Sequence, residues 1–131
     1  CDAEIDRARS NVGAFLRLLE ARDVEAARAY VGEGCRFVFP GGREPDGIDA
    51  IVAQSGQRYR RVGKVVERTE AFATPNGVVV YVIGALHGEW RTGDAFDSIR
   101  FIDRFLVVDG LIRAQEVWND AGEHRLRSAS A

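Results

Sequence analysis

The sequence is poor in the residues that build metal, redox and disulfide sites: only two cysteines and two histidines occur among its 131 residues. Cys1 and Cys35 form no CxxC motif and have no histidine at metal-ligand spacing, so neither a zinc site nor a redox motif is predicted. We therefore expect no metal ion and no organic cofactor. Sparse cysteine favours a reduced, cytoplasmic protein, with a lipoprotein anchored through Cys1 as the alternative.

Long hydrophobic runs, an excess of positive charge and phosphate-binding loops are missing as well. Without a long apolar run, no membrane span is expected. The 18 basic and 20 acidic residues leave a net charge of -2, which provides no electrostatic footprint for nucleic acid. The basic run Arg58–Lys64 is interpreted as the solvated end of a helix. No GxGxxG or GxxxxGK motif follows a strand to hold a phosphate.

What the sequence does contain is enough apolar surface for a core. With 46% hydrophobic residues and no repeat or linker, we predict one globular domain over residues 1–131. Helical and strand periodicity follow each other along the chain. Helices are predicted over 2–21, over 24–31 and from 46, strands over 35–39, 64–74, 77–90 and on both sides of Asp109-Gly110, and a frayed tail over 123–131. Helices followed by consecutive antiparallel strands indicate the α+β class.

The most informative stretch is the hairpin predicted at Asp109-Gly110, because this dipeptide favours a two-residue turn with positive φ at both positions. If these two residues are the central pair, Asp103 faces Glu116 across the strands on one face. Facing carboxylates repel, and an enclosed face favours retention of a proton, so we predict an acid/base pair with a raised pKa. A slip of one residue would separate them. The same face carries the aromatic side chains of Phe101 and Trp118.

His87 is the third candidate for acid/base chemistry, and its direction depends on how the neighbouring strands align. If Ala85 pairs with Asp103, His87 joins the acid face and can relay a proton. If Gly84 pairs with Asp103, His87 points to the opposite face. The sequence leaves both alternatives open.

Three groups of residues together resemble a known superfamily. They are Arg22-Asp23-Val24-Glu25-Ala26 after the first helix, Phe39-Pro40 before Gly47-Ile48, and Ile102-Asp103-Arg104-Phe105 followed by Asp109-Gly110-Leu111-Ile112 and Val117-Trp118-Asn119-Asp120. Their order and spacing over about residues 5–120 resemble the SnoaL-like and ketosteroid-isomerase-like branch of the nuclear transport factor 2-like superfamily. The resemblance implies a cone-shaped α+β barrel, in which a curved antiparallel sheet wraps around three N-terminal helices. It also implies that Asp103 points into a pocket for an apolar ligand.

The residues of steroid isomerisation do not carry over. The resemblance places Phe15, Val31 and Ser55 where the isomerases have tyrosines, and Phe39 where they have the catalytic aspartate. Phenylalanine offers neither a hydroxyl nor a carboxylate, so that reaction is not expected. The leading hypothesis is a cofactor-independent cyclase, isomerase or dehydratase acting on a hydrophobic carbonyl compound. Asp103, Glu116 and His87 are its predicted catalytic residues, and Phe15, Phe39, Phe101 and Trp118 its predicted pocket walls.

The alternative hypothesis is a non-catalytic module that binds a small molecule or forms a dimer. Homodimers of this superfamily often pair through the outer face of the sheet. The apolar residues predicted on that face are Ile102, Leu106 and Val117.

Overall fold

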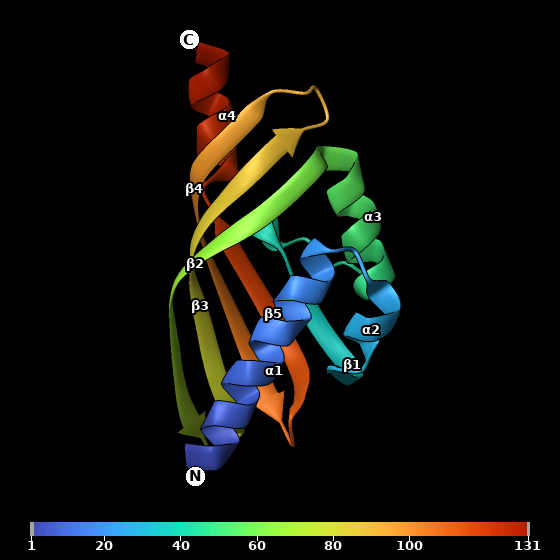
Figure 1. Ribbon diagram of the computed structural model, residues 1–131, viewed down its shortest axis with the longest axis vertical. Helices are drawn as coiled ribbons and strands as arrows, with labels where there is room; N and C mark the ends of the chain where they lie inside the picture. The colour runs from blue at the N-terminus through green and yellow to red at the C-terminus, as the bar shows by residue number, and fades with distance from the viewer. Residues whose placement is uncertain (1, 131) are drawn as a thin grey trace.

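The computed structural model describes residues 2–130, so Cys1, with its predicted alternative role, and Ala131 lie outside it. Helices and strands alternate early in the chain and four strands follow in succession (Figure 1). The elements are α1 Asp2–Glu20, α2 Val24–Arg28, β1 Val31–Val38, a 3-10 turn η1 Pro40–Gly42, α3 Ile48–Arg58, β2 Tyr59–Thr74, β3 Gly77–Trp90, β4 Ala95–Val108, β5 Leu111–Asn119 and α4 Ala121–Ser130.

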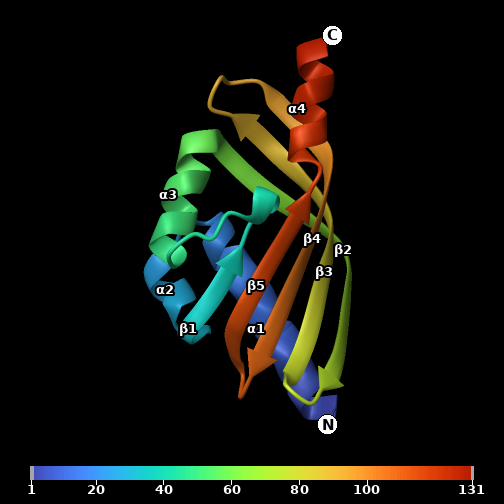
Figure 2. The ribbon, with the colours of Figure 1, turned by 180° about the vertical axis from the view of Figure 1, so that it is seen from behind.

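The five strands form one curved sheet in the order β1-β5-β4-β3-β2. Helix α1 lies across its concave face, with α2 and α3 beside it, and the view from behind shows the other face of the sheet uncovered (Figures 1 and 2). This arrangement confirms the predicted α+β cone, although the sheet does not close. It is also mixed rather than purely antiparallel, because β1 joins the edge of β5 in parallel.

The first three helices begin close to where the sequence predicts them, but α2 ends at Arg28 and the chain already enters β1 at Val31. One stripe of α1 is buried against the sheet because its apolar residues recur at three- and four-residue steps. Asp23 caps α2, since its Oδ1 accepts a hydrogen bond from the backbone N–H of Ala26 at 3.2 Å. None of the helices within residues 2–130 is long and apolar enough to cross a membrane.

The tail predicted to fray from residue 123 is helical instead, as α4. Asn119 accepts a hydrogen bond from the backbone N–H of Ala121 at 3.1 Å, which satisfies a donor at the start of the helix. Glu123 and Arg127 form an ion pair one turn apart at 3.2 Å. Local capping and charge pairing explain this helix, because it has little apolar periodicity.

The hairpin between β4 and β5 has the predicted turn but not the predicted register. Asp109 and Gly110 have φ angles of 52° and 79°, as a type I′ turn requires. Val107 pairs with Ile112 as expected, but Leu106 then pairs with Ala114. Arg113 is therefore the extra residue of a β-bulge, and every pair beyond it is shifted by one position.

The bulge contradicts the predicted pairing of Asp103 with Glu116. Asp103 faces Val117 instead, and Glu116 lies opposite Arg104 on the outer face of the sheet. The predicted contact of Phe101 with Trp118 is wrong for the same reason, because Phe101 pairs with Asn119. Val117 is buried on the inner face and is not part of the outer surface that the sequence predicted.

Candidate functional site

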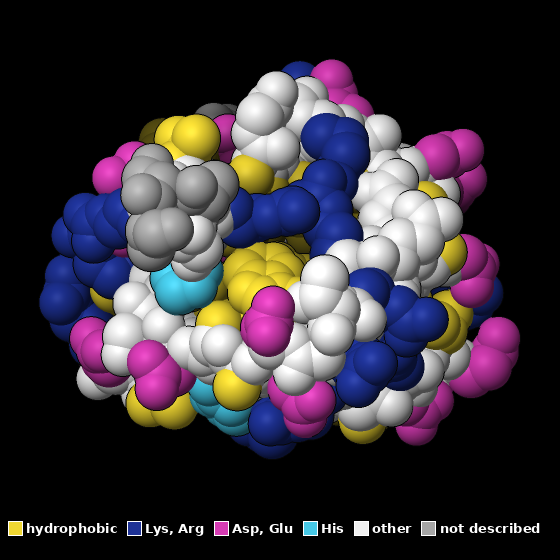
Figure 3. All heavy atoms as spheres, turned by 90° about the horizontal axis from the view of Figure 1, so that it is seen from above, with side chains coloured by type: hydrophobic (Ala, Val, Ile, Leu, Met, Phe, Trp, Pro, Cys, Tyr) yellow, Lys and Arg dark blue, Asp and Glu magenta, His cyan; other side chains and the backbone are white. Residues whose placement is uncertain are grey.

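A cavity of about 520 Å³ opens at the end of the cone next to α4. This volume falls within the range of small-molecule sites, roughly 300 to 1,000 Å³. The view onto this end shows an apolar floor with basic side chains along one side and an acidic side chain on the opposite rim (Figure 3). Apolar walls come from every layer of the fold: Leu16, Leu19, Phe39, Ile51, Val52, Val62, Leu86, Trp90, Phe101 and Val117.

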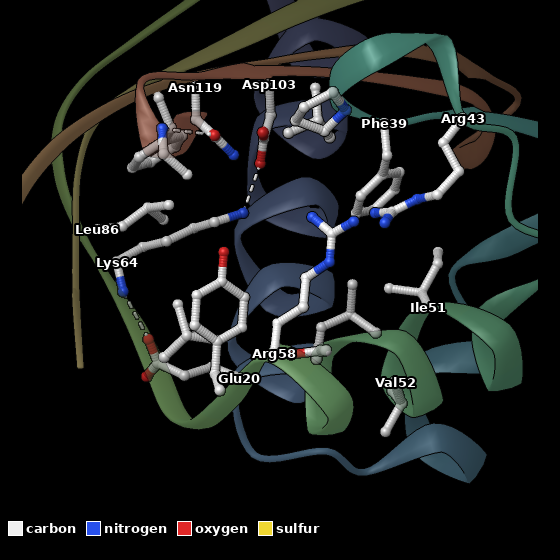
Figure 4. Close-up of a pocket in the computed structure, with 18 of the residues that line it drawn as sticks. Glu20, Phe39, Arg43, Ile51, Val52, Arg58, Lys64, Leu86, Asp103 and Asn119 are labelled. Atoms are coloured by element: carbon white, nitrogen blue, oxygen red, sulfur yellow. Dashed lines mark hydrogen bonds and ion pairs between the residues drawn. The ribbon is translucent and has the colours of Figure 1, made fainter. Parts of the chain in front are cut away.

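The cavity wall contains a buried ion pair between β2 and β4. Nζ of Lys64 donates a hydrogen bond to Oδ2 of Asp103 at 2.6 Å (Figure 4). The side chain of Asp103 is 0% exposed and that of Lys64 is 26% exposed, so a ligand meets the ammonium first. The same ammonium lies 4.9 Å from the centroid of the Phe101 ring, a cation–π contact. The pair is a partly shielded charge centre in an otherwise apolar wall.

Secondary structure holds both partners in place. Asp103 faces inward because it lies two residues from the buried Phe101 and two from the buried Phe105, and residues two apart on a strand share a face. Lys64 projects from the edge strand β2, where its backbone N–H donates to Oε1 of Glu20 at the end of α1, at 2.8 Å. Helix α1 thus fixes the strand that carries the lysine.

Two buried acceptors in the cavity wall lack a partner. Within residues 2–130, neither Oδ1 of Asp103 nor Oε1 of Gln115 accepts a hydrogen bond. An unsatisfied buried acceptor costs roughly 1 to 3 kcal/mol, so a hydrogen-bond donor that reached either atom would be favourable. The site combines a cation, a carboxylate oxygen and an amide within an apolar enclosure.

The predicted catalytic residues are not brought together. Asp103 lines the cavity, whereas Glu116 lies on the outer face and pairs with Arg104 at 3.5 Å. Asp103 therefore meets a lysine instead of a second carboxylate. His87 packs over Gly63, five residues along β3 from Val82, the partner of Asp103. Val82 and Gly84 lie two residues apart and share a face of β3. Pairing of Asp103 with Val82 therefore points His87 to the opposite face, as pairing of Asp103 with Gly84 would have done.

Of the four aromatic residues predicted to form the pocket walls, two line the cavity and two lie elsewhere. Phe39 and Phe101 line the cavity. Phe15 is fully buried in the core, edge-on to Phe105 with ring centroids 6.1 Å apart. Trp118 is 51% exposed on the outer face of the sheet.

Sequence reasoning missed Lys64, Tyr59 and Gln115. The basic run Arg58–Lys64 was predicted to be a solvated helix end, but α3 stops at Arg58 and β2 starts at Tyr59. Strand alternation then turns part of this run into the cavity.

The sequence did contain a signal for the bulge in β5. Ile112 and Val117 are both apolar but lie five residues apart, so they cannot both face inward on a regular strand.

The fold and cavity define the class of protein: an open α+β cone around a pocket of small-molecule size. The chain belongs to the SnoaL-like domain family, whose model matches residues 12–115. This confirms the resemblance seen in the sequence. No protein of curated function matches the chain.

Solved structures with the same fold are numerous and distant in sequence. A candidate polyketide cyclase of Xanthomonas campestris pv. campestris is 20% identical, with a TM-score of 0.74 over 92% of this chain and 96% of that one. A candidate SnoaL-like polyketide cyclase of Jannaschia sp. CCS1 is 18% identical, with a TM-score of 0.71 over 93% and 91%. TerC, co-crystallised with polyporic acid, is 16% identical, with a TM-score of 0.73 over 92% and 96%. At these identities the likeness is one of fold.

Proposed function

We propose that this SnoaL-like protein is a cofactor-independent acid/base enzyme acting on an apolar, carbonyl-containing small molecule. The reaction is a cyclisation, isomerisation or dehydration that begins with proton transfer. The observation that carries the proposal is the Lys64–Asp103 ion pair, which lies in the wall of an apolar cavity and leaves one carboxylate oxygen unpaired. The candidate polyketide cyclases among the structural neighbours support the choice of reaction class.

Each partner has a separate role in the proposed reaction. Lys64 Nζ donates a hydrogen bond to the substrate carbonyl oxygen, which makes the adjacent C–H more acidic. Oδ1 of Asp103 takes that proton: the C–H bond breaks, and its electron pair moves to the oxygen as an enolate held by the ammonium. Cyclisation follows when the enolate carbon bonds to a second carbonyl carbon: the π electrons of that carbonyl move to its oxygen, which takes the proton from Asp103. Isomerisation follows when the proton instead returns to a different carbon. Lys64 takes the place that the sequence had given to Glu116 and His87.

Deuterium exchange into a simple ketone tests this first step without knowledge of the substrate. The probe is 2-tetralone, an apolar bicyclic ketone, whose α-hydrogens exchange in D₂O at a rate that proton NMR measures. We expect the protein to accelerate exchange. Asp103→Asn and Lys64→Met are expected to reduce the acceleration about 100-fold or more, the usual contribution of one general acid or base.

The matched control is Arg104→Met, which removes a positive charge from the opposite face of β4. It is expected to leave exchange unchanged. Thermal melting shows whether each variant is folded. A folded Asp103→Asn variant that exchanges at the wild-type rate contradicts the proposal, and so does an equal loss in Arg104→Met.

We also propose that two copies pair through the outer face of the sheet. This face carries an apolar row across β3, β4 and β5, formed by Ile83, Ile102 and Trp118. Ile102 is 40% and Trp118 51% exposed, so the row offers adjacent apolar surface that a partner could cover. A two-fold axis would bury the same row on both copies.

Light scattering after size exclusion measures this assembly directly. Wild type is expected to have twice the chain mass and the double variant Ile102→Lys/Trp118→Lys the mass of one chain. Leu126→Lys replaces an exposed apolar residue on α4, away from the sheet, and is expected to remain a dimer. If the wild-type protein is monomeric, the proposal of a dimer is wrong, and the proposal of an acid/base enzyme is not affected.

A further inference from the structure

Four arginines from separate parts of the chain line the cavity. Arg22 follows α1, Arg43 lies in the loop after η1, Arg58 ends α3 and Arg125 belongs to α4. In Figure 4 the side chains of Arg43 and Arg58 point into the cavity next to the Phe39 ring. The guanidinium carbon of Arg43 lies 5.6 Å from the centroid of the Phe39 ring, and that of Arg125 lies 5.4 Å from the centroid of the Trp90 ring. The basic groups are thus set against aromatic walls.

Among residues 2–130, no acidic side chain neutralises these arginines. None of the four forms an ion pair with a residue in the described range 2–130, whereas Arg28, Arg36, Arg61, Arg68, Arg100, Arg104 and Arg127 all do. Lys64 already engages both carboxylates of the cavity wall. Its backbone N–H donates to Glu20, and its ammonium donates to Asp103. In a chain of net charge -2, the cavity is therefore a local concentration of positive charge.

Arg43 and Arg58 lie near each other in the cavity (Figure 4). Burial and the neighbouring charge of Arg58 lower the pKa of Arg43, and the Nε of Arg43 is buried without a hydrogen-bond partner among residues 2–130. Burial raises the pKa of Tyr59, against the opposing effects of Arg58, Arg125 and Arg43. The positive charges of three cavity arginines thus act on one phenol. Like charges gathered in this way repel one another, and an anion bound between them relieves that repulsion through charge-assisted hydrogen bonds.

We propose that the ligand of this cavity is an organic anion, with its apolar body against the aromatic and aliphatic walls and its acidic group held by Arg43 and Arg58. Arg22 and Arg125 add positive charge beside them. The inference rests on the proposed function, because it names the class of molecule that reaches the Lys64–Asp103 pair. The acidic group binds near the arginines, and the carbonyl lies deeper, at the ammonium. The arginines are therefore binding residues, and the ion pair remains the reacting centre.

A pair of fluorescent probes that differ by one acidic group tests the inference. 8-Anilinonaphthalene-1-sulfonate is an apolar anion, and N-phenyl-1-naphthylamine is the same skeleton without the sulfonate. We expect the anion to bind at least about tenfold more tightly, as charge-assisted hydrogen bonds to two arginines allow. The single variants Arg43→Gln and Arg58→Gln are each expected to weaken the anion several-fold and to leave the neutral probe unchanged.

Arg60→Gln is the control, because it removes the same charge from an exposed residue of β2 that does not line the cavity. We expect it to affect neither probe. Equal affinity for the two probes overturns the inference, as does an equal loss in Arg60→Gln. If the neutral probe binds and the anion has no advantage, only this inference fails. If neither probe binds, the cavity is not a ligand site, and the proposed function fails with it.

Discussion

Replacing Lys64 by methionine is expected to destabilise the fold more than replacing Asp103 by asparagine. Lys64→Met leaves a carboxylate that is 0% exposed without its cation, and removing one partner of a buried pair costs roughly 3 to 5 kcal/mol. Asp103→Asn leaves an ammonium on a flexible stem that is 26% exposed. It can turn toward solvent, so we expect a cost of about 1 to 2 kcal/mol.

A double-mutant cycle isolates the interaction itself. A contact ion pair at an effective dielectric constant near 20 attracts by roughly 4 kcal/mol, and the exposure of Lys64 reduces this, so we expect a coupling of about 2 kcal/mol. Guanidinium unfolding of wild type, both single variants and the double variant provides the four free energies. A coupling below about 0.5 kcal/mol, or a larger loss in Asp103→Asn than in Lys64→Met, refutes the reasoning.

The remaining predictions concern packing and the half-buried thiol of Cys35. A Cβ at Gly84 would collide with the backbone carbonyl oxygen of Val65, so Gly84→Ala is expected to lower the free energy of unfolding by more than about 2 kcal/mol. Gly122 has open space around it, so the free energy of unfolding of Gly122→Ala is expected to stay within about 1 kcal/mol of wild type. Burial raises the pKa of Cys35 to about 11, so in a variant without the other cysteine its alkylation at pH 8 is expected to be slow when folded and fast in guanidinium. Rapid alkylation of Cys35 in the folded protein would contradict the raised pKa of this thiol.

The fold could be predicted where local chemistry decides the structure. Asp23 is a good helix cap, and Asp109-Gly110 is a good hairpin turn, and both behave as their residue types dictate. The parallel pairing of β1 with β5 is a long-range contact between strands separated by most of the chain, and no local pattern specifies it. Helix α4 depends on a cap and an ion pair rather than on apolar periodicity, so it was missed.

The site was harder to predict because one bulge reverses the direction of every side chain beyond it. Arg113 moved Glu116 and Trp118 to the outer face and left Asp103 inside. The partner of Asp103 comes from another strand, 39 residues away, and only the assembled sheet brings Lys64 to it. Arg43 and Arg58 belong to elements whose relative position is likewise a tertiary property.

The most direct test of the central claim compares Asp103→Asn with Glu116→Gln in the exchange of 2-tetralone α-hydrogens. Both variants neutralise one acid of the same hairpin, and the structure places those acids on opposite faces of the sheet. The account predicts loss of exchange in Asp103→Asn and the wild-type rate in Glu116→Gln. Loss in both variants, or in Glu116→Gln alone, would contradict the assignment of proton transfer to the Lys64–Asp103 pair.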